Sequence, residues 1–151
     1  MQIILGTIAL ILAFIYGCFS ALFGFLFPNY YTKTEIRNNL DMNIKSYQIE
    51  YHEDTHGGFH GDGEEIIIFR PNEKQIEKIE AEWQKTPVDS GIAPLIFRNS
   101  EYNGLELAKY IPNTKGFWLY KNRNEFKSGY SYNFSFAFFD GEKVYYYELD
   151  T

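Results

Sequence analysis

The feature that most constrains this chain is a long uncharged stretch at its N-terminus. Residues 3–27 contain no Asp, Glu, Lys, Arg or His, and 20 of these 25 residues are apolar. As a helix the stretch would be roughly 37 Å long, enough to cross about 30 Å of bilayer hydrocarbon with some tilt. Pro28 ends the run. The sequence therefore predicts a transmembrane helix at 3–27 that contacts membrane lipid.

Two cleaved forms are the alternatives to a permanent anchor. A secretory signal carries a basic stretch before a shorter apolar core, whereas only Met1 and Gln2 precede this one. Lipidation at Cys18 would place the bulky Tyr16 where a small residue is usual, and the residues after Cys18 stay apolar. An uncleaved, single-pass membrane protein is favoured over both.

The flanking charges bear on orientation. Lys33, Arg37 and Lys45 follow the apolar stretch, and no basic side chain precedes it. Because basic residues are enriched on the cytoplasmic side of membrane helices, the following domain is expected to face the cytoplasm.

Small residues recur along the same stretch. Ala9, Ala13, Gly17 and Ala21 are spaced four residues apart. Such a stripe lets a second helix approach closely in lipid, which favours self-association or a membrane partner. The alternative is that Gly and Ala are simply common in membrane helices.

The overall charge excludes one class of partner. Asp and Glu number 20 against 14 Lys and Arg, so the formal net charge is -6. A nucleic-acid-binding surface is therefore not expected. Lys121, Arg123 and Lys127 form a small basic group that is expected to be a solvated connection.

The rest of the sequence predicts two regions. The first is a juxtamembrane connection at 28–43, with a short helical turn around 34–40, and the second is a soluble α+β domain at 44–151. The expected architecture is an antiparallel sheet with one main helix packed on one face. Residues 105–111 fit either a strand or a short helix. Apart from the C-terminal hairpin, strands are expected at 46–52, 65–69, 95–97 and 117–120.

The helix signal is clearest after Pro71. Asn72 is a good N-cap and Gln75 completes a capping box. Ile76, Ile79 and Trp83 fall on one side at helical spacing, and Pro87 ends the pattern. This stripe is expected to pack on the sheet.

The C-terminal hairpin is predicted from an alternation of aromatic and small residues over 130–138. Asp140-Gly141 then suggests a two-residue turn before 143–149 returns. That turn would place Phe136 opposite Tyr145 and Ser135 opposite Tyr146.

All three histidines lie within nine residues, in a loop rich in glycine and carboxylates. Imidazole nitrogens and carboxylate oxygens are ligands for Zn²⁺ and other divalent cations. The expected ligands are His56, His60, Asp62 and Asp54, with His52 and Glu64 as further possibilities. The spacing matches no known metal motif. A purely structural loop, or a partner-binding or catalytic surface, stays open.

No catalytic set can be assembled from the sequence. The single cysteine lies in the apolar stretch, and no Gly-x-Ser-x-Gly elbow occurs. No catalytic residue or cofactor is assigned. A non-enzymatic, partner-binding domain on a membrane anchor is favoured, and the alternative is a divalent-metal site in the 52–65 loop that supports hydrolysis.

The loop DTHGGFHGDGE at 54–64 and the aromatic ending YYYELDT at 145–151 resemble a group of small, uncharacterised bacterial membrane-anchored proteins. The similarity covers most of residues 46–151, including the helix that contains Trp83. The resemblance implies a bacterial single-domain protein, and it carries no activity, ligand or catalytic residue.

Overall fold

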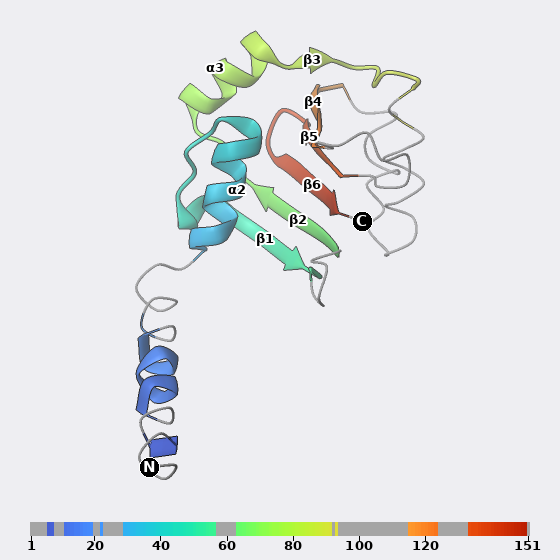
Figure 1. The fold of residues 1–151 in the computed structure, drawn as a ribbon. Coiled ribbons are helices and arrows are strands. Elements are labelled where there is room, and N and C mark those ends of the chain that lie inside the picture. The colour runs from blue at the N-terminus through green and yellow to red at the C-terminus, as the bar shows by residue number, and fades with distance from the viewer. Residues whose placement is uncertain are drawn as a thin grey trace.

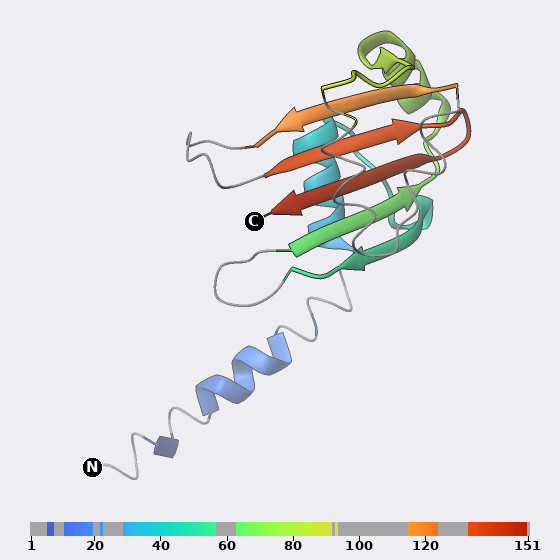
Figure 2. The ribbon, with the colours of Figure 1, turned by 90° about the vertical axis from the view of Figure 1, so that its right-hand side faces the viewer.

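The computed structural model describes residues 6–7, 11–19, 22, 29–56, 63–91, 93, 115–123 and 133–150. These residues form a six-stranded antiparallel sheet of order β1-β2-β6-β5-β4-β3, with α2 and α3 packed on one face (Figures 1 and 2). The expected α+β class is confirmed. The elements are α2 Tyr30–Leu40, η1 Ser46–Gln48, β1 Ile49–Asp54, β2 Gly63–Phe69, α3 Glu73–Glu82, β3 Gln84–Lys85, β4 Phe117–Asn122, β5 Phe134–Phe139 and β6 Val144–Asp150.

The structure describes the predicted transmembrane stretch 3–27 only in part. Residues 6–7, 11–19 and 22 are helical and exposed. Among the described residues, no helix has both the length and the apolar character needed to cross a membrane. Ala9 and Ala21 of the small-residue stripe lie outside the described residues, so lipid contact and self-association stay predictions.

Helix α2 is longer than the short turn expected at 34–40, and it packs on the sheet. Thr32, Ile36 and Leu40 recur every four residues and are buried, because this spacing places them on one side of a helix. Ile36 and Leu40 pack in one hydrophobic cluster with Ile79 and Trp83 of the α3 segment. The expectation of one main helix on the sheet was therefore wrong, since two helices share the face.

Helix α3 confirms the capping prediction. The Asn72 side chain accepts a hydrogen bond from the Gln75 backbone N–H at 3.0 Å, and the Asn72 N–H donates to Gln75 Oε1 at 2.8 Å. Ile79 and Trp83 are buried. The Trp83 N–H donates to the Ile79 carbonyl at 2.9 Å and closes the last turn.

The sheet separates two hydrophobic clusters. Beneath α2 and α3 lie Ile67, Tyr146 and Ala137, and the opposite face carries Ile66, Phe136 and Tyr147. This division follows from strand alternation, because successive side chains point to opposite faces. The strands expected at 65–69 and 117–120 are confirmed as β2 and β4.

The β5–β6 hairpin has the expected faces but a different register. Phe136 pairs with Tyr147 and not with Tyr145, a shift of two residues. The cause is the turn, because the strands end at Phe139 and Val144 and leave a four-residue loop between them. The Asp140 carboxylate accepts the backbone N–H groups of Glu142 and Lys143 at 2.8 and 2.7 Å, which stabilises that longer loop.

Strand β1 departs from the expected alternation. Ile49 pairs with Phe69, and Tyr51 pairs with the very next residue, Ile68, so one extra residue bulges out of β1. Ile49 packs beneath the helices, whereas Tyr51 turns to the opposite face and is exposed. His52 consequently lies on the face that α2 covers.

Several expectations fall outside the described residues. They include the strand at 95–97, the strand or helix at 105–111, and the first part of the C-terminal strand at 130–132. The centre of the histidine loop, 57–62, also lies outside them.

Candidate metal centre

A row of polar residues crosses five strands at one end of the face beneath α2. The register places Glu65 opposite both Asp54 and Glu148, and Ser135 opposite both Glu148 and Lys121. Apart from His52 on β1, the adjacent row on this face is hydrophobic and contains Ile67, Tyr146, Ala137 and Leu119. The sheet face therefore changes from hydrophobic to carboxylate-rich within one row.

Local backbone structure places the β1 side chains beside this row. The β1 bulge turns Asp54 and His52 toward α2. His52 Nε2 then lies 2.8 Å from Glu65 Oε1. Glu65 itself is almost fully buried, with about 4% of its side chain exposed. Without the bulge, Asp54 and His52 would face the opposite side of the sheet.

Helix α2 adds two polar side chains from above. Carboxylate oxygens of Glu35, Glu65 and Glu148 lie within 4.8 Å of one another. One turn along α2, Asn39 Nδ2 donates to Tyr146 Oη at 2.6 Å and to Glu148 Oε2 at 2.9 Å. The cluster is thus built jointly by a helix and the two strands β2 and β6.

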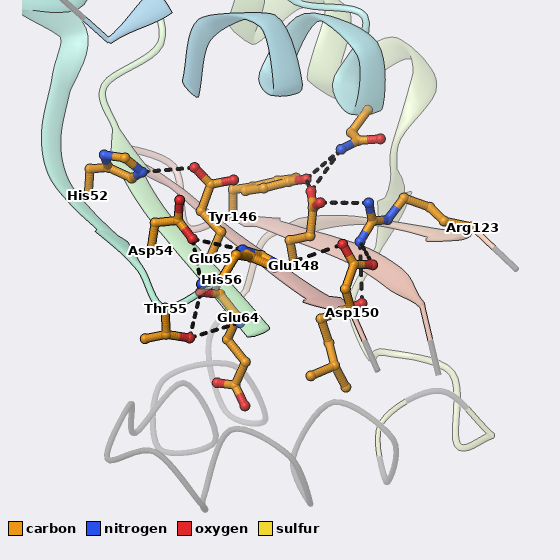
Figure 3. A network of polar contacts seen from close by, with 12 residues as sticks. His52, Asp54, Thr55, His56, Glu64, Glu65, Arg123, Tyr146, Glu148 and Asp150 are labelled. Carbon is orange, nitrogen blue, oxygen red and sulfur yellow. Dashed lines mark hydrogen bonds and ion pairs between the residues drawn. The ribbon is translucent and has the colours of Figure 1, made fainter. Parts of the chain in front are cut away.

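Glu148 is the most heavily bonded carboxylate of the cluster (Figure 3). Arg123 Nη1 lies 2.6 Å from Glu148 Oε1, and Arg123 Nη2 lies 2.6 Å from Asp150 Oδ1. The Tyr146 hydroxyl donates to Glu148 Oε2. Arg123 therefore clamps two carboxylates of β6, and the expectation that it belongs to a solvated connection was wrong for this residue.

His56 approaches the cluster from the base of the β1–β2 loop. Its Nδ1 lies 2.8 Å from Asp54 Oδ1 and its Nε2 lies 3.5 Å from Asp150 Oδ2. An ionised carboxylate can only accept, so Nδ1 donates to Asp54 and the lone pair of neutral His56 is on Nε2. Gly63 makes this position accessible, because a Cβ there would lie 2.4 Å from the His56 Cα.

The carboxylate that bonds His56 differs from those at the centre. Burial acts to raise the pKa of Asp54, but hydrogen bonds from the backbone and ring of His56 hold the pKa below its usual value. Asp54 is therefore ionised at neutral pH and orients the His56 ring. This carboxylate–histidine pair is the arrangement that commonly supports a metal-bound imidazole.

The central carboxylates are shifted in the opposite direction. Burial is the largest of the effects that raise the pKa of Glu35 to about 8, and hydrogen bonding to Glu65 and the negative charge of Glu65 contribute to the same increase. Burial also raises the pKa of Glu65 and of Glu148, against the opposing effects of Glu35 on Glu65 and of Tyr146 and Arg123 on Glu148. Like charges this close favour protonation of one partner.

The charges of the cluster do not balance. Five carboxyl groups meet one guanidinium, that of Arg123, among the described residues; the carboxyl groups are those of Glu35, Asp54, Glu65, Glu148 and Asp150. Buried atoms without a hydrogen-bond partner among the described residues also gather in the cluster and its polar row, namely Glu65 Oε2, His56 Nε2, Arg123 Nε and Ser135 Oγ. Buried polar atoms without a partner are rare in native proteins and call for one.

The predicted ligands differ in where the structure places them. Asp54 and His56 are in contact and reach the cluster, and His52 bonds Glu65. Glu64 points away from the cluster (Figure 3). His60 and Asp62 lie outside the described residues.

The central ligand candidates were missed from the sequence. They are Glu35, Glu65, Glu148 and Asp150. Arg123, the ion-pair partner of Glu148 and Asp150, was missed as well. A signal was present, because Glu148 lies between Tyr147 and Leu149 in a largely apolar strand, and Glu65 directly precedes the apolar run 66–69. A charged side chain at a position expected to be interior is rarely fully buried unless it is paired or binds a ligand.

Comparisons of the chain with protein-family models, with curated proteins and with solved structures found no match. The functional interpretation therefore depends on the geometry of this chain.

Proposed function

We propose that the carboxylate cluster beneath α2 binds a divalent cation. The single observation that carries the proposal is the convergence of Glu35, Glu65 and Glu148, whose carboxylate oxygens lie within 4.8 Å of one another. Glu65 and Glu148 are buried and Glu35 is partly buried. Three like charges at this separation repel strongly unless protons or a cation neutralise them. A divalent cation would satisfy all three and the unpartnered Glu65 Oε2.

A second group of possible ligands adjoins the first. His56, Glu148 and Asp150 also place one ligand atom each within 4.8 Å of one another. Glu148 is common to both groups, so the two positions are adjacent and share a carboxylate. Carboxylates favour Mg²⁺, Ca²⁺ and Mn²⁺, and an imidazole favours Zn²⁺ and similar ions. Mn²⁺ accepts oxygen ligands and is therefore the first probe, followed by Zn²⁺.

Hydrogen bonds with neighbouring side chains orient the proposed ligands His56 and Glu148. Asp54 bonds the far nitrogen of His56, and Asn39 and Tyr146 bond one oxygen of Glu148. Such outer bonds fix ligand orientation and typically change metal affinity by about 10- to 100-fold when removed. The predicted metal site at Asp54, His56, His60 and Asp62 is thus extended toward β2, β6 and α2, with Asp54 and His56 at its edge.

The test is direct metal binding by the full chain, purified in a mild nonionic detergent and stripped with a chelator. Titration with Mn²⁺, followed by electron paramagnetic resonance of the free ion, is expected to give saturable binding that Zn²⁺ displaces. Glu65→Gln keeps the side-chain size and removes a buried ligand charge, so it should weaken Mn²⁺ binding at least tenfold.

Glu64→Gln is the matched control, because it makes the same chemical change one position away on the side chain that points away from the cluster (Figure 3). It should bind Mn²⁺ as the wild type does. Absence of Mn²⁺ and Zn²⁺ binding in the wild type, or equal affinities for the two variants, would refute the proposal.

The proposal includes a membrane tether. Residues 3–27 carry no charged side chain, which supports a single-pass anchor of the cation-binding domain, and Lys33 and Arg37 support a cytoplasmic position. Retention of the chain in membranes after alkaline extraction tests the tether. A non-enzymatic partner-binding role and metal-dependent hydrolysis both stay predictions.

A further inference from the structure

The outer side of α2 differs in charge from the side that faces the cluster. Tyr30, Lys33, Thr34 and Arg37 follow one another at helical spacing and form a single stripe. They line a pocket of about 420 Å³ together with Asn43, Ile44 and Lys45 of the loop that follows the helix. This volume is within the range of small-molecule sites. The pocket lies on a side of α2 that the cation cluster does not use.

Three basic side chains and no acidic one line this pocket, although the protein carries a net charge of -6. Lys33 Nζ donates a hydrogen bond to the Ser46 hydroxyl oxygen at 3.3 Å, and this hydroxyl carries no charge. Among the ion pairs of the described residues, none includes Lys33, Arg37 or Lys45.

Other basic residues behave differently. Arg70 contacts Glu50 and Glu142, and Lys78 contacts Asp41. Both are compensated by carboxylates, which is the usual outcome on an acidic surface. The cations of the pocket are therefore a concentrated positive charge that no carboxylate of the described residues neutralises.

The loop side of the pocket is held in place by internal bonds. Gln75 Nε2 donates to the Asn43 carbonyl at 2.8 Å, and the Lys45 N–H donates to Gln48 Oε1 at 2.9 Å. Ile44 is buried in the hydrophobic cluster beneath the helices. The loop is therefore anchored on both sides of Ile44, and the pocket wall is preformed.

We propose that this pocket binds a phosphate-bearing anion. A guanidinium matches two phosphate oxygens in a bidentate arrangement, and two ammonium groups supply point charges beside it. Arg37, Lys33 and Lys45 provide these groups, and the Thr34 hydroxyl lines the same pocket. The proposal does not depend on the cation site.

Two sources can supply this chemistry, a phospholipid headgroup and soluble phosphate. The sequence favours the headgroup, because the uncharged stretch ends at Phe27, close to the start of α2. Exposed aromatic side chains flank the pocket residues: Tyr31 is 76% exposed and Tyr47 is 86% exposed. Tyrosines of this kind are enriched at the level of lipid headgroups.

The experiment uses the full chain in a nonionic detergent at low ionic strength, titrated by calorimetry with three probes. They are short-chain phosphatidylglycerol, inorganic phosphate and short-chain phosphatidylcholine, the last of which has no net charge. Saturable binding of phosphatidylglycerol without phosphate binding identifies a lipid headgroup site. Saturable phosphate binding identifies a site for soluble phosphate. Either result supports the pocket, and neither requires a divalent cation.

Arg37→Gln and Lys45→Gln should each weaken binding of the favoured probe at least tenfold. Lys74→Gln, an exposed lysine on α3 for which no ion pair is found among the described residues, is the matched control and should leave it unchanged. Unchanged melting temperatures show that the variants fold. The proposal fails if neither anionic probe binds, if phosphatidylcholine binds equally well, or if the pocket variants match Lys74→Gln.

Discussion

The two ends of the sheet face beneath α2 are built from the same strands and follow opposite rules. At one end, Phe69, Val144 and Phe139 are paired across the sheet and fully or almost fully buried. At the other end, Glu65 and Glu148 occupy equivalent positions and are buried to a similar extent. Burial of an apolar side chain stabilises the fold, whereas burial of a carboxylate costs free energy unless it is paired.

This difference between the apolar and the carboxylate end indicates which part of the domain has a functional role. The apolar end accounts for much of the stability, and the carboxylate end reduces the stability that the same area could supply. Retaining several carboxylates in a buried row is costly, as expected for a site whose role is to bind a ligand.

The largest expected effect is at the apolar end. Phe139→Ala removes a buried ring and should lower the free energy of unfolding by about 3–5 kcal/mol. Urea unfolding followed by tryptophan fluorescence measures the change, because Trp83 and Trp118 are both buried. Tyr47→Ala removes an exposed ring and should change stability by less than about 0.5 kcal/mol. Similar losses for both variants would show that the Phe139 cluster is not a tightly packed core.

The next effect tests how the carboxylate end is held. Arg123→Met removes the guanidinium that pairs with Glu148 and Asp150 and should cost about 3 kcal/mol at neutral pH, because a buried charge loses its partner. The loss should shrink as pH falls below neutrality, because burial raises the pKa of Glu148 and favours its uptake of a proton.

Arg70→Met is the control for this prediction. Arg70 also pairs with two carboxylates, but half of its side chain is exposed, so the loss should stay below about 1 kcal/mol. If the two arginine variants lose the same stability, burial of the Arg123 pair has no special role.

The last expected effect is a pH dependence of stability. The pKa of Glu35 is raised from its usual value near 4.5 to about 8, so folding takes up a proton between these values. Stability should therefore fall as pH rises from about 4.5 to about 8, and the raised pKa values of Glu65 and Glu148 act in the same direction. Glu35→Gln should flatten this slope.

Urea unfolding of the chelator-treated full chain at pH 5, 6, 7 and 8 measures the slope. Glu77→Gln, at an exposed position of α3, should keep the wild-type slope. Parallel profiles for the wild type and Glu35→Gln would contradict the assignment of the raised pKa to Glu35.

Local signals explain which parts of the fold could be predicted. The α3 cap depends on Asn72 and Gln75, which are close in sequence, and the faces of the C-terminal hairpin depend on strict alternation. The hairpin register could not be obtained in this way. It depends on how the Asp140 side chain accepts two backbone N–H groups, and the Asp140-Gly141 pair alone favours a shorter turn.

The cluster depends on contacts between residues far apart in sequence. Glu35, Glu65 and Glu148 meet only after α2 docks and β6 pairs with β2. Asp54 and His56 could be identified because they are neighbours within one loop. Glu35 could not, because a single carboxylate on a polar helix is indistinguishable from a solvated one until the position of the sheet is known.

The bulge in β1 has a consequence for comparing this chain with others. Removing one residue between Ile49 and Tyr51 would remove the bulge but leave Tyr51 opposite Ile68 and His52 opposite Ile67, so the faces beyond that point would not change. Regular pairing of the unshortened strand from Ile49 onward would instead turn Tyr51 and Glu53 toward α2 in place of His52 and Asp54. A homologue with a β1 one residue shorter and regular pairing therefore keeps the histidine side of the cluster, whereas one with the same length and no bulge loses it.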